Sequence, residues 1–300
     1  MTVDSTGLEQ RLRCNAADRV PVPPDDLAGR VGSQLGDQFL EVGMRAKQCI
    51  MRALDAHRSS TRGRLRKSRW WRWSAGACDP RVSFRRKRVL DFGCGVGRLM
   101  RHFVEEARQC EFWASDIHRP SIEWLERHLV PPFRVVVNKR DPPLPFAEGY
   151  FDLVMALSVF THLTDSWKPW LVELRRIIKP GGLALITFHH KAAYEALCGK
   201  PFEEERIGME VFHQDQDWER GGPFVFHSEW WVREHWGRVM PVEQIVPAGL
   251  DNWQSIALLR KPPRPWMDGM KAGARRILSW LEQPVRPTAV RRMGDDRDFS

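Results

Sequence analysis

Residues 88 to 100 read Arg-Val-Leu-Asp-Phe-Gly-Cys-Gly-Val-Gly-Arg-Leu-Met, and the fold of the chain can be worked out from them. The run from Val89 to Phe92 is short and mostly apolar, which indicates a buried strand rather than a helix. Glycines follow at every second position, and apolar residues then recur at helical intervals, which predicts a helix that begins near Gly97. A strand, a glycine-rich turn and a helix form a nucleotide-binding unit, because glycines let a ligand approach the backbone without meeting a Cβ atom.

Two acidic residues near this turn indicate which ligand it takes. The glycine spacing is Gly-x-Gly-x-Gly, whereas dinucleotide-binding folds use Gly-x-Gly-x-x-Gly. Asp91 stands two residues before the first glycine, where its carboxylate would oppose a pyrophosphate and suit a ligand amine. Asp116 ends the next apolar run, where a ribose-binding acid belongs after a second strand. These features disfavour a dinucleotide-dependent oxidoreductase, which we keep only as a third alternative.

The sequence Asp91-Phe-Gly-Cys-Gly-Val-Gly-Arg with the later Asp116-Ile117 resembles the class I S-adenosylmethionine-dependent methyltransferases. The likeness is to the type 11/12 kind that modifies small molecules or sugars. It extends over about residues 20 to 260 and is most specific from 88 to 188. It implies a doubly wound α/β fold with a mostly parallel, seven-stranded sheet, and S-adenosylmethionine as the cofactor. The cofactor-binding residues that it implies are Asp91, Gly93, Cys94, Gly95, Gly97, Asp116, Ile117 and Ser158, among which Cys94 is expected to pack rather than to act as a nucleophile.

The rest of the chain divides into four parts around this unit. We expect an N-terminal extension with a cap helix (1–57), a basic Arg/Trp-rich insertion (58–87), the methyltransferase domain (88–261) and a C-terminal tail (262–300). Periodicity predicts the cap helix from Gly36 to Ala56, which either covers the cofactor site or only packs on the core. Further strands are predicted at 133–137, 151–157, 183–188, 239–246 and 253–259. The irregular stretch 190–227 is expected to be a substrate lid.

The net charge of +9 is concentrated in one segment. Residues 58–88 contain twelve Arg and Lys residues and one acid, Asp79, so the rest of the chain holds 35 basic and 37 acidic residues. Trp70, Trp71 and Trp73 alternate there with arginines, a composition that can stack on bases or lie at a membrane interface. It equally suits an insertion without a partner. We favour the insertion, because nothing else in the chain indicates nucleic acid.

Features that the sequence lacks limit the expected location of the protein and its metal content. It has no apolar run long enough for a membrane span and no signal-peptide core at its start. Its six cysteines form no C-x-x-C pair and no evident metal cluster with histidines. We therefore expect a cytoplasmic protein without a structural metal.

A general base is needed only if the methyl acceptor is protonated, because the cofactor supplies the electrophile. His162, in the loop after the fourth strand, is the best candidate by position. His189 and His190, at the end of the fifth strand, stand behind it. His162 could instead serve as a loop anchor through a hydrogen bond, and of the two roles we favour the structural one.

Two hypotheses remain from different classes. The first is transfer of a methyl group to a small molecule or glycan, at oxygen. The second is a binding protein that uses residues 58–88 to hold nucleic acid or an acidic surface. The Asp/Asn-Pro-Pro-Tyr/Phe motif of amino-directed DNA methyltransferases is absent after the fourth strand, where Ala156-Leu-Ser-Val stands, and no Pro-Cys nucleophile occurs. Nucleic-acid methylation is thereby disfavoured, although RNA ribose methylation stays open.

Overall fold

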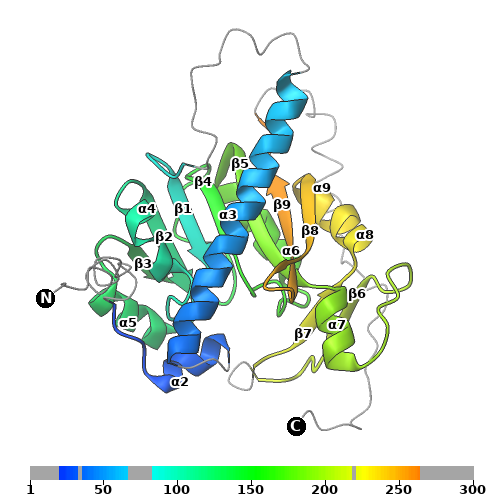
Figure 1. The fold of residues 1–300 in the computed structure, drawn as a ribbon, viewed down its shortest axis with the longest axis horizontal. Coiled ribbons are helices and arrows are strands. Elements are labelled where there is room, and N and C mark those ends of the chain that lie inside the picture. The colour runs from blue at the N-terminus through cyan, green and yellow to red at the C-terminus, as the bar shows by residue number, and fades with distance from the viewer. Residues whose placement is uncertain (1–19, 33–35, 67–82, 218–220, 264–300) are drawn as a thin grey trace, which may run out of the picture.

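The computed structural model describes residues 20–32, 36–66, 83–217 and 221–263. Within these ranges nine strands form one sheet (Figure 1). Five of them are parallel and lie in the order β3, β2, β1, β4 and β5. Two antiparallel strands, β9 and then β8, continue the sheet beyond β5. Their bounds are β1 (Arg88–Phe92), β2 (Glu111–Asp116), β3 (Arg134–Val137), β4 (Phe151–Ala156), β5 (Ile178–His189), β8 (Val242–Leu250) and β9 (Gln254–Arg260).

These seven strands confirm the predicted mostly parallel sheet. Apolar residues on both faces of its central strands explain the doubly wound arrangement, since a parallel sheet is covered by helices on both sides. Val89 and Met155 face one core, which α3 and α5 help to fill, and Leu90 and Val154 face the other, which α6 helps to fill. Six of the helices are α3 (Asp37–Arg66), α4 (Val104–Ala107), α5 (Arg119–His128), α6 (Trp167–Ile177), α8 (Glu229–Trp231) and α9 (Gly237–Val239).

The N-terminal helix α3 crosses one face of the sheet diagonally (Figure 1). It packs closely on the segment after the glycine turn, because a Cβ atom at Gly43 would overlap the carbonyl oxygen of Arg98. It continues to Arg66, so the expected boundary between 57 and 58 falls inside a helix, and only the two ends of the basic segment, 58–66 and 83–87, are described. Residues 67–82, the first 19 residues and 264–300 lie outside the described ranges.

The prediction of a helix from Gly97 is wrong in its starting point. Residues 95–99 form turns, and a 3-10 turn (Met100–Phe103) leads into the four-residue α4. Gly97 has a φ angle of 78°, which a right-handed helix cannot include. The amide of Gly97 instead bonds the carbonyl of Cys94 at 3.0 Å.

The described parts of the stretch 190–227, which are 190–217 and 221–227, are more regular than expected. They contain α7 (Lys191–Cys198) and an antiparallel hairpin of β6 (Met209–Phe212) and β7 (Phe224–His227). The hairpin joins the end of β5 where His189 pairs with Phe226. A short helix, α8, follows Ser228, whose hydroxyl accepts the amide of Trp231 at 3.3 Å as an N-cap. In the described ranges no helix is both long and apolar enough to cross a lipid bilayer.

Candidate functional site

The glycine turn follows β1 at the carboxyl edge of the parallel strands, where open α/β sheets bind their ligands. Gly93 and Gly95 have φ angles of 75° and 54°, which residues with a Cβ atom rarely adopt. The amides of Gly93 and Cys94 both donate to the carbonyl of Ser115, at 2.8 and 3.0 Å. These bonds fix the turn against the end of β2, so the sequence-predicted residues of both strands share one site.

Asp91 is a buried acid without a complete set of partners. It lies on β1 beside Ala114 of β2 and Met155 of β4, and its side chain is 2% exposed. Its Oδ2 atom has no hydrogen-bond partner among the described residues. Burial, and secondarily the nearby Asp116 carboxylate, raise the pKa of Asp91 to about 7. A buried carboxylate with one oxygen that accepts no hydrogen bond is suited to bind a positively charged ligand group.

Asp116 ends β2 and holds the turn. Its Oδ2 accepts the amide of Gly95 at 2.7 Å, and its Oδ1 accepts the amide of His118 at 2.8 Å. Both oxygens keep capacity for a further donor, because each carboxylate oxygen can accept two hydrogen bonds. The next residue, Ile117, is 55% exposed at the same edge and offers an apolar surface.

Asn138 follows β3 at this edge. Its amide donates to the backbone carbonyl of Asp116 at 3.0 Å, and its side-chain amide donates to Lys139. The Oδ1 atom of Asn138 is buried without a partner among the described residues. It is thus a second acceptor at this edge whose partner is missing.

Cys94 packs inside the turn. The thiol is buried and donates to the carbonyl of Gly95 at 3.4 Å. Burial, with the nearby Asp116 and Asp91 carboxylates, raises the pKa of Cys94 well above its usual range. The thiol is therefore neutral, which agrees with a packing role.

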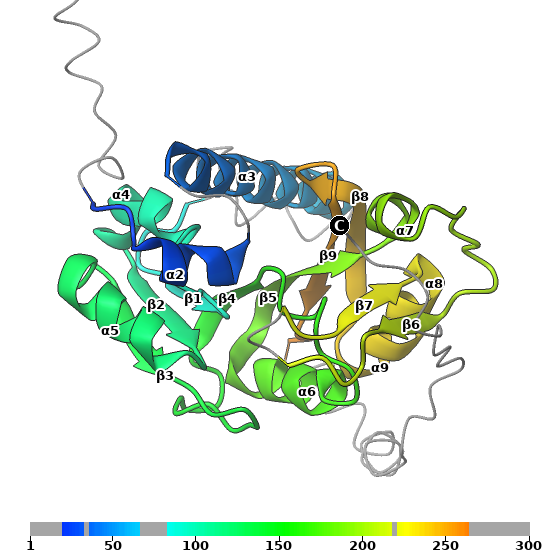
Figure 2. The same ribbon diagram turned by 90° about the horizontal axis from the view of Figure 1, so that it is seen from below.

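Two valines close over the glycine turn from distant parts of the chain. Val31 ends the N-terminal segment of α2 (Asp25–Ala28) and the turn Gly29–Val31, and a Cβ atom at Gly95 would overlap its Cγ1. Val159, in the loop after β4, stands in the same way over Gly93. Figure 2 shows α2 at this edge beside β1, with the hairpin of β6 and β7 on the β5 side. The short α2 segment, rather than α3, therefore lies on the turn, and sequence periodicity gave no signal for it.

Ser158 starts the loop after β4 in a left-handed conformation, with a φ angle of 55°. Its amide donates to Thr187 Oγ1 at 2.8 Å, and its hydroxyl lies 2.9 Å from Gln254 Nε2. Gln254 also approaches His189 Nε2, at 3.5 Å. Left-handed non-glycine residues are uncommon and cluster at functional sites. The loop after β4, the end of β5 and the start of β9 thus meet in one polar group.

His162 lies next to this group. Its Nδ1 donates to the carbonyl of Pro223 at 2.8 Å, so Nε2 is its basic nitrogen. Burial lowers its pKa below the ordinary value, although the Pro223 bond acts in the opposite direction. The ring centres of His162 and His189 are 6.4 Å apart, and Phe224 packs against both rings. Both expected roles, base and loop anchor, are compatible with this arrangement.

The residues at this edge fit S-adenosylmethionine, to judge by their unpaired buried atoms. The Oδ2 of Asp91 suits the cofactor's amine, Asp116 suits the ribose hydroxyls, and the Oδ1 of Asn138 suits an amino group of the base. Among the described residues, no three His, Cys, Asp or Glu side chains are grouped to hold a metal ion.

Comparison with known proteins finds similarity to methyltransferases. A family profile described as a methyltransferase domain matches residues 89–182. Over 106 residues the chain is 31% identical to a ubiquinone/menaquinone biosynthesis C-methyltransferase UbiE from Cupriavidus metallidurans, covering 33% of this chain and 42% of that protein. The UbiE of Cupriavidus taiwanensis is 29% identical over 179 residues, which cover 55% of this chain and 68% of that one.

A phthiotriol/phenolphthiotriol dimycocerosates methyltransferase from Mycobacterium ulcerans is 28% identical, over 39% of this chain and 45% of that one. The chain thus spans less than half of two of these three relatives and about two thirds of the other. Among solved structures, an S-adenosylmethionine-dependent methyltransferase from Mesorhizobium loti matches with a TM-score of 0.47 and 13% identity, covering 60% of this chain and 93% of that one.

Proposed function

Since residues 89–182 form a class I S-adenosylmethionine-dependent methyltransferase domain, we propose that the chain transfers the cofactor's methyl group to a hydroxyl oxygen of a small, uncharged acceptor. The family match confirms the resemblance seen in the sequence, and S-adenosylmethionine is the cofactor of this domain. The observation that carries the donor side of the proposal is the buried, unpartnered Asp91 carboxylate oxygen beside the glycine turn.

On the donor side, the chain would hold the cofactor through its two acids. Asp91 would take the amine, and the ionic bond would offset the cost of burying the carboxylate. Asp116 is already oriented by the amides of Gly95 and His118, so little side-chain entropy is lost when it binds a ribose. When bound, the cofactor supplies an electrophilic methyl group, and the protein's part is to orient the acceptor against it.

The side chains expected to contact the acceptor, namely His189, Phe224 and Trp253, are aromatic and uncharged. Burial lowers the pKa of His189 to about 3, with a smaller contribution from His162, so its ring is uncharged at neutral pH. Phe224 stacks on His189 with an angle of 17° between the rings, and Trp253 lies edge-on with ring centres 6.4 Å apart. Such walls favour a phenol or a neutral sugar over a charged acceptor.

The β6–β7 hairpin, within the stretch expected to be a substrate lid, would cover the acceptor. The start of β7 is tied to the loop after β4 twice, because Val225 donates to the Thr161 carbonyl at 2.8 Å and His162 donates to Pro223. The hairpin therefore places Phe224 against the candidate base. A cover at this position would exclude water from the reacting oxygen.

For the chemistry, Nε2 of His162 would receive the hydroxyl proton as the acceptor oxygen bonds the methyl carbon and that carbon's bond to the cofactor's sulfur breaks. Its lowered pKa keeps it unprotonated at neutral pH. Holding oxygen and methyl carbon in line at near contact is worth about 7–11 kcal/mol of the barrier. The names of the two UbiE relatives describe C-methylation, and a phenol deprotonated by the same base can react at carbon or at oxygen. The structure of the methylated product therefore shows whether the acceptor's carbon or its oxygen is methylated.

The test is a screen of phenols and neutral sugars with methyl-labelled S-adenosylmethionine. The product's NMR spectrum separates O-methyl from C-methyl compounds. We expect His162→Gln to lower kcat, Phe224→Ala to raise the acceptor KM without changing cofactor affinity, and the control His128→Gln, on α5, to change neither. Transfer to carbon alone would contradict the oxygen assignment, and unchanged kcat in His162→Gln would exclude the base.

A further inference from the structure

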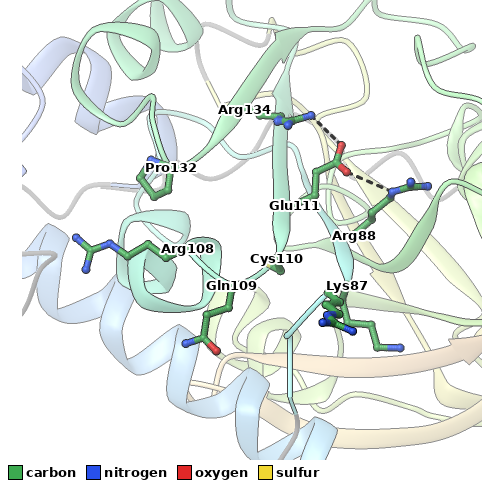
Figure 3. A pocket seen from close by; sticks show the side chains of 9 residues that line it. Lys87, Arg88, Arg108, Gln109, Cys110, Glu111, Pro132 and Arg134 are labelled. Carbon is green, nitrogen blue, oxygen red and sulfur yellow. Dashed lines mark hydrogen bonds and ion pairs between the residues drawn. The ribbon is translucent and has the colours of Figure 1, made fainter.

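A recess lies at the amino edge of the sheet, opposite the glycine turn (Figure 3). Its volume is about 450 Å³, and its walls come from the segment leading into β1, the turn between α4 and β2, and the start of β3. Its charged lining residues are five cations and one acid, namely Arg86, Lys87, Arg88, Arg108, Arg134 and Glu111. The recess therefore includes the last residues of the basic segment that the sequence singles out.

Glu111 arranges two of these cations. Arg88 donates to its Oε2 at 3.3 Å, and Arg134 donates to its Oε1 at 3.0 Å from the neighbouring strand. Figure 3 shows the two guanidinium groups approaching Glu111 from opposite sides. The indole of Trp113, at 2.8 Å, and the hydroxyl of Tyr150 also donate to this carboxylate. Both oxygens of Glu111 are thus bonded within the protein.

Aromatic rings support the same two arginines. The Arg88 guanidinium lies 4.3 Å from the centre of the Tyr150 ring, and that of Arg134 lies 5.6 Å from the Trp113 ring. Their side chains remain 43% and 58% exposed. A guanidinium has five N–H donors, and the bond to Glu111 uses one on each arginine, so both keep donors for a ligand. Orienting them beforehand reduces the entropy lost on binding.

The charge of the recess is unbalanced. Arg108 pairs with Glu105 at 2.9 Å, and Lys87 approaches Asp152 at 3.5 Å. Asp152 also pairs with Lys179 at 2.6 Å. When these three partners are counted with the lining residues, six cations face three carboxylates, and a surplus of three positive charges remains. The recess has little apolar lining, which comes from Cys110 and Pro132.

We propose that this recess binds a small ligand through a phosphate or diphosphate group. Arginine forks match phosphate oxygens in two-point hydrogen bonds, and Arg88 and Arg134 are both held beside the same carboxylate, that of Glu111. A multiply charged anion would balance the surplus. The scarce apolar lining favours a compact, polar ligand over one with a large hydrophobic body. This site is separate from the glycine turn and does not depend on the proposed methyl transfer.

Calorimetric titration of the full chain with sodium pyrophosphate, at low and at physiological salt, tests the assignment. We expect one site that weakens as salt increases, since exposed charges are screened. Arg134→Gln should weaken pyrophosphate binding at least about tenfold. Arg134→Lys should weaken it less, because lysine keeps the positive charge but cannot form the two-point hydrogen bond of a guanidinium. Arg206→Gln is the matched control, because Arg206 forms an exposed ion pair with Glu203 at 2.8 Å, outside the recess.

Arg88→Gln provides a second variant, and thermal melting verifies that each variant is folded. Absence of pyrophosphate binding by wild type at low salt would overturn the proposal, as would equal weakening in Arg206→Gln and Arg134→Gln. Vesicles containing phosphatidylglycerol separate the source of the phosphate. Binding to vesicles by protein that does not bind pyrophosphate would overturn the assignment of a small ligand.

Discussion

A change of pH should alter the affinity for S-adenosylmethionine through Asp91. Burial and the Asp116 carboxylate raise the pKa of Asp91 to about 7. The cofactor's amine is attracted by the ionised carboxylate and not by the protonated acid. With this pKa, about a tenth of Asp91 is ionised near pH 6 and about three quarters near pH 7.5. Affinity should therefore rise about eightfold over this range, and binding below pH 7 should release a proton.

Calorimetry in two buffers with different ionisation enthalpies measures both quantities, because the difference in heat counts the protons released. Asp91→Asn is the control, since its side chain keeps the shape of Asp91 but cannot ionise. It should bind weakly and with the same affinity at both pH values. If wild type binds equally tightly at pH 6 and 7.5 and releases no proton, the carboxylate is already ionised and the reasoning from its burial is refuted.

The same acid should affect stability in the absence of ligand. The pKa of Asp91 is higher in the folded chain, about 7, than the ordinary 3.8, so the folded state binds the proton more tightly. Stability should therefore fall as pH rises from about 4 to about 7, by up to about 4 kcal/mol for this group. Above pH 7, Asp91→Asn should unfold at higher urea concentration than wild type. Equal urea midpoints above pH 7 would contradict this.

Two further predictions concern packing, and urea unfolding measures both. Gly43→Ala should destabilise the protein by about 1–3 kcal/mol, because the new Cβ atom would overlap the Arg98 carbonyl oxygen and lie 2.7 Å from His102 Nε2. The control is Gly237→Ala, whose new Cβ atom would meet no atom within 4 Å and should leave stability unchanged or raise it. Equal losses of stability in the two variants would contradict the close approach of α3. Ser228→Ala should cost about 1 kcal/mol through the lost N-cap, and an unchanged midpoint would contradict that role.

Local patterns were sufficient to predict the centre of the fold. The strands, the glycine turn and the positions of Asp91 and Asp116 follow from apolar periodicity and short spacings, which act over a few residues. The structure brings both acids and the glycines together because β1 and β2 are paired in parallel register. Their individual roles toward the cofactor stay predictions.

Long-range contacts explain what the sequence did not reveal. Val31 covers Gly95, and Phe224 stacks on His189, although each pair is far apart in the chain. No periodicity links such residues. The β6–β7 hairpin was missed because Phe224–His227 is almost entirely buried and lacks the polar–apolar alternation of a half-exposed strand. The helix after the glycine turn starts later than predicted because Gly97 has a positive φ angle, which a right-handed α-helix cannot include.

Equilibrium dialysis with methyl-labelled S-adenosylmethionine tests the central claim, that the carboxyl edge around Asp91 is the cofactor site. Wild type should bind with a Kd of about micromolar order, which corresponds to about 8 kcal/mol. Asp91→Ala and Asp116→Ala should each lose this binding while they remain folded, and Glu203→Ala, on an exposed turn, should retain it. Failure of folded wild type to bind, or full binding by Asp91→Ala, would contradict the account.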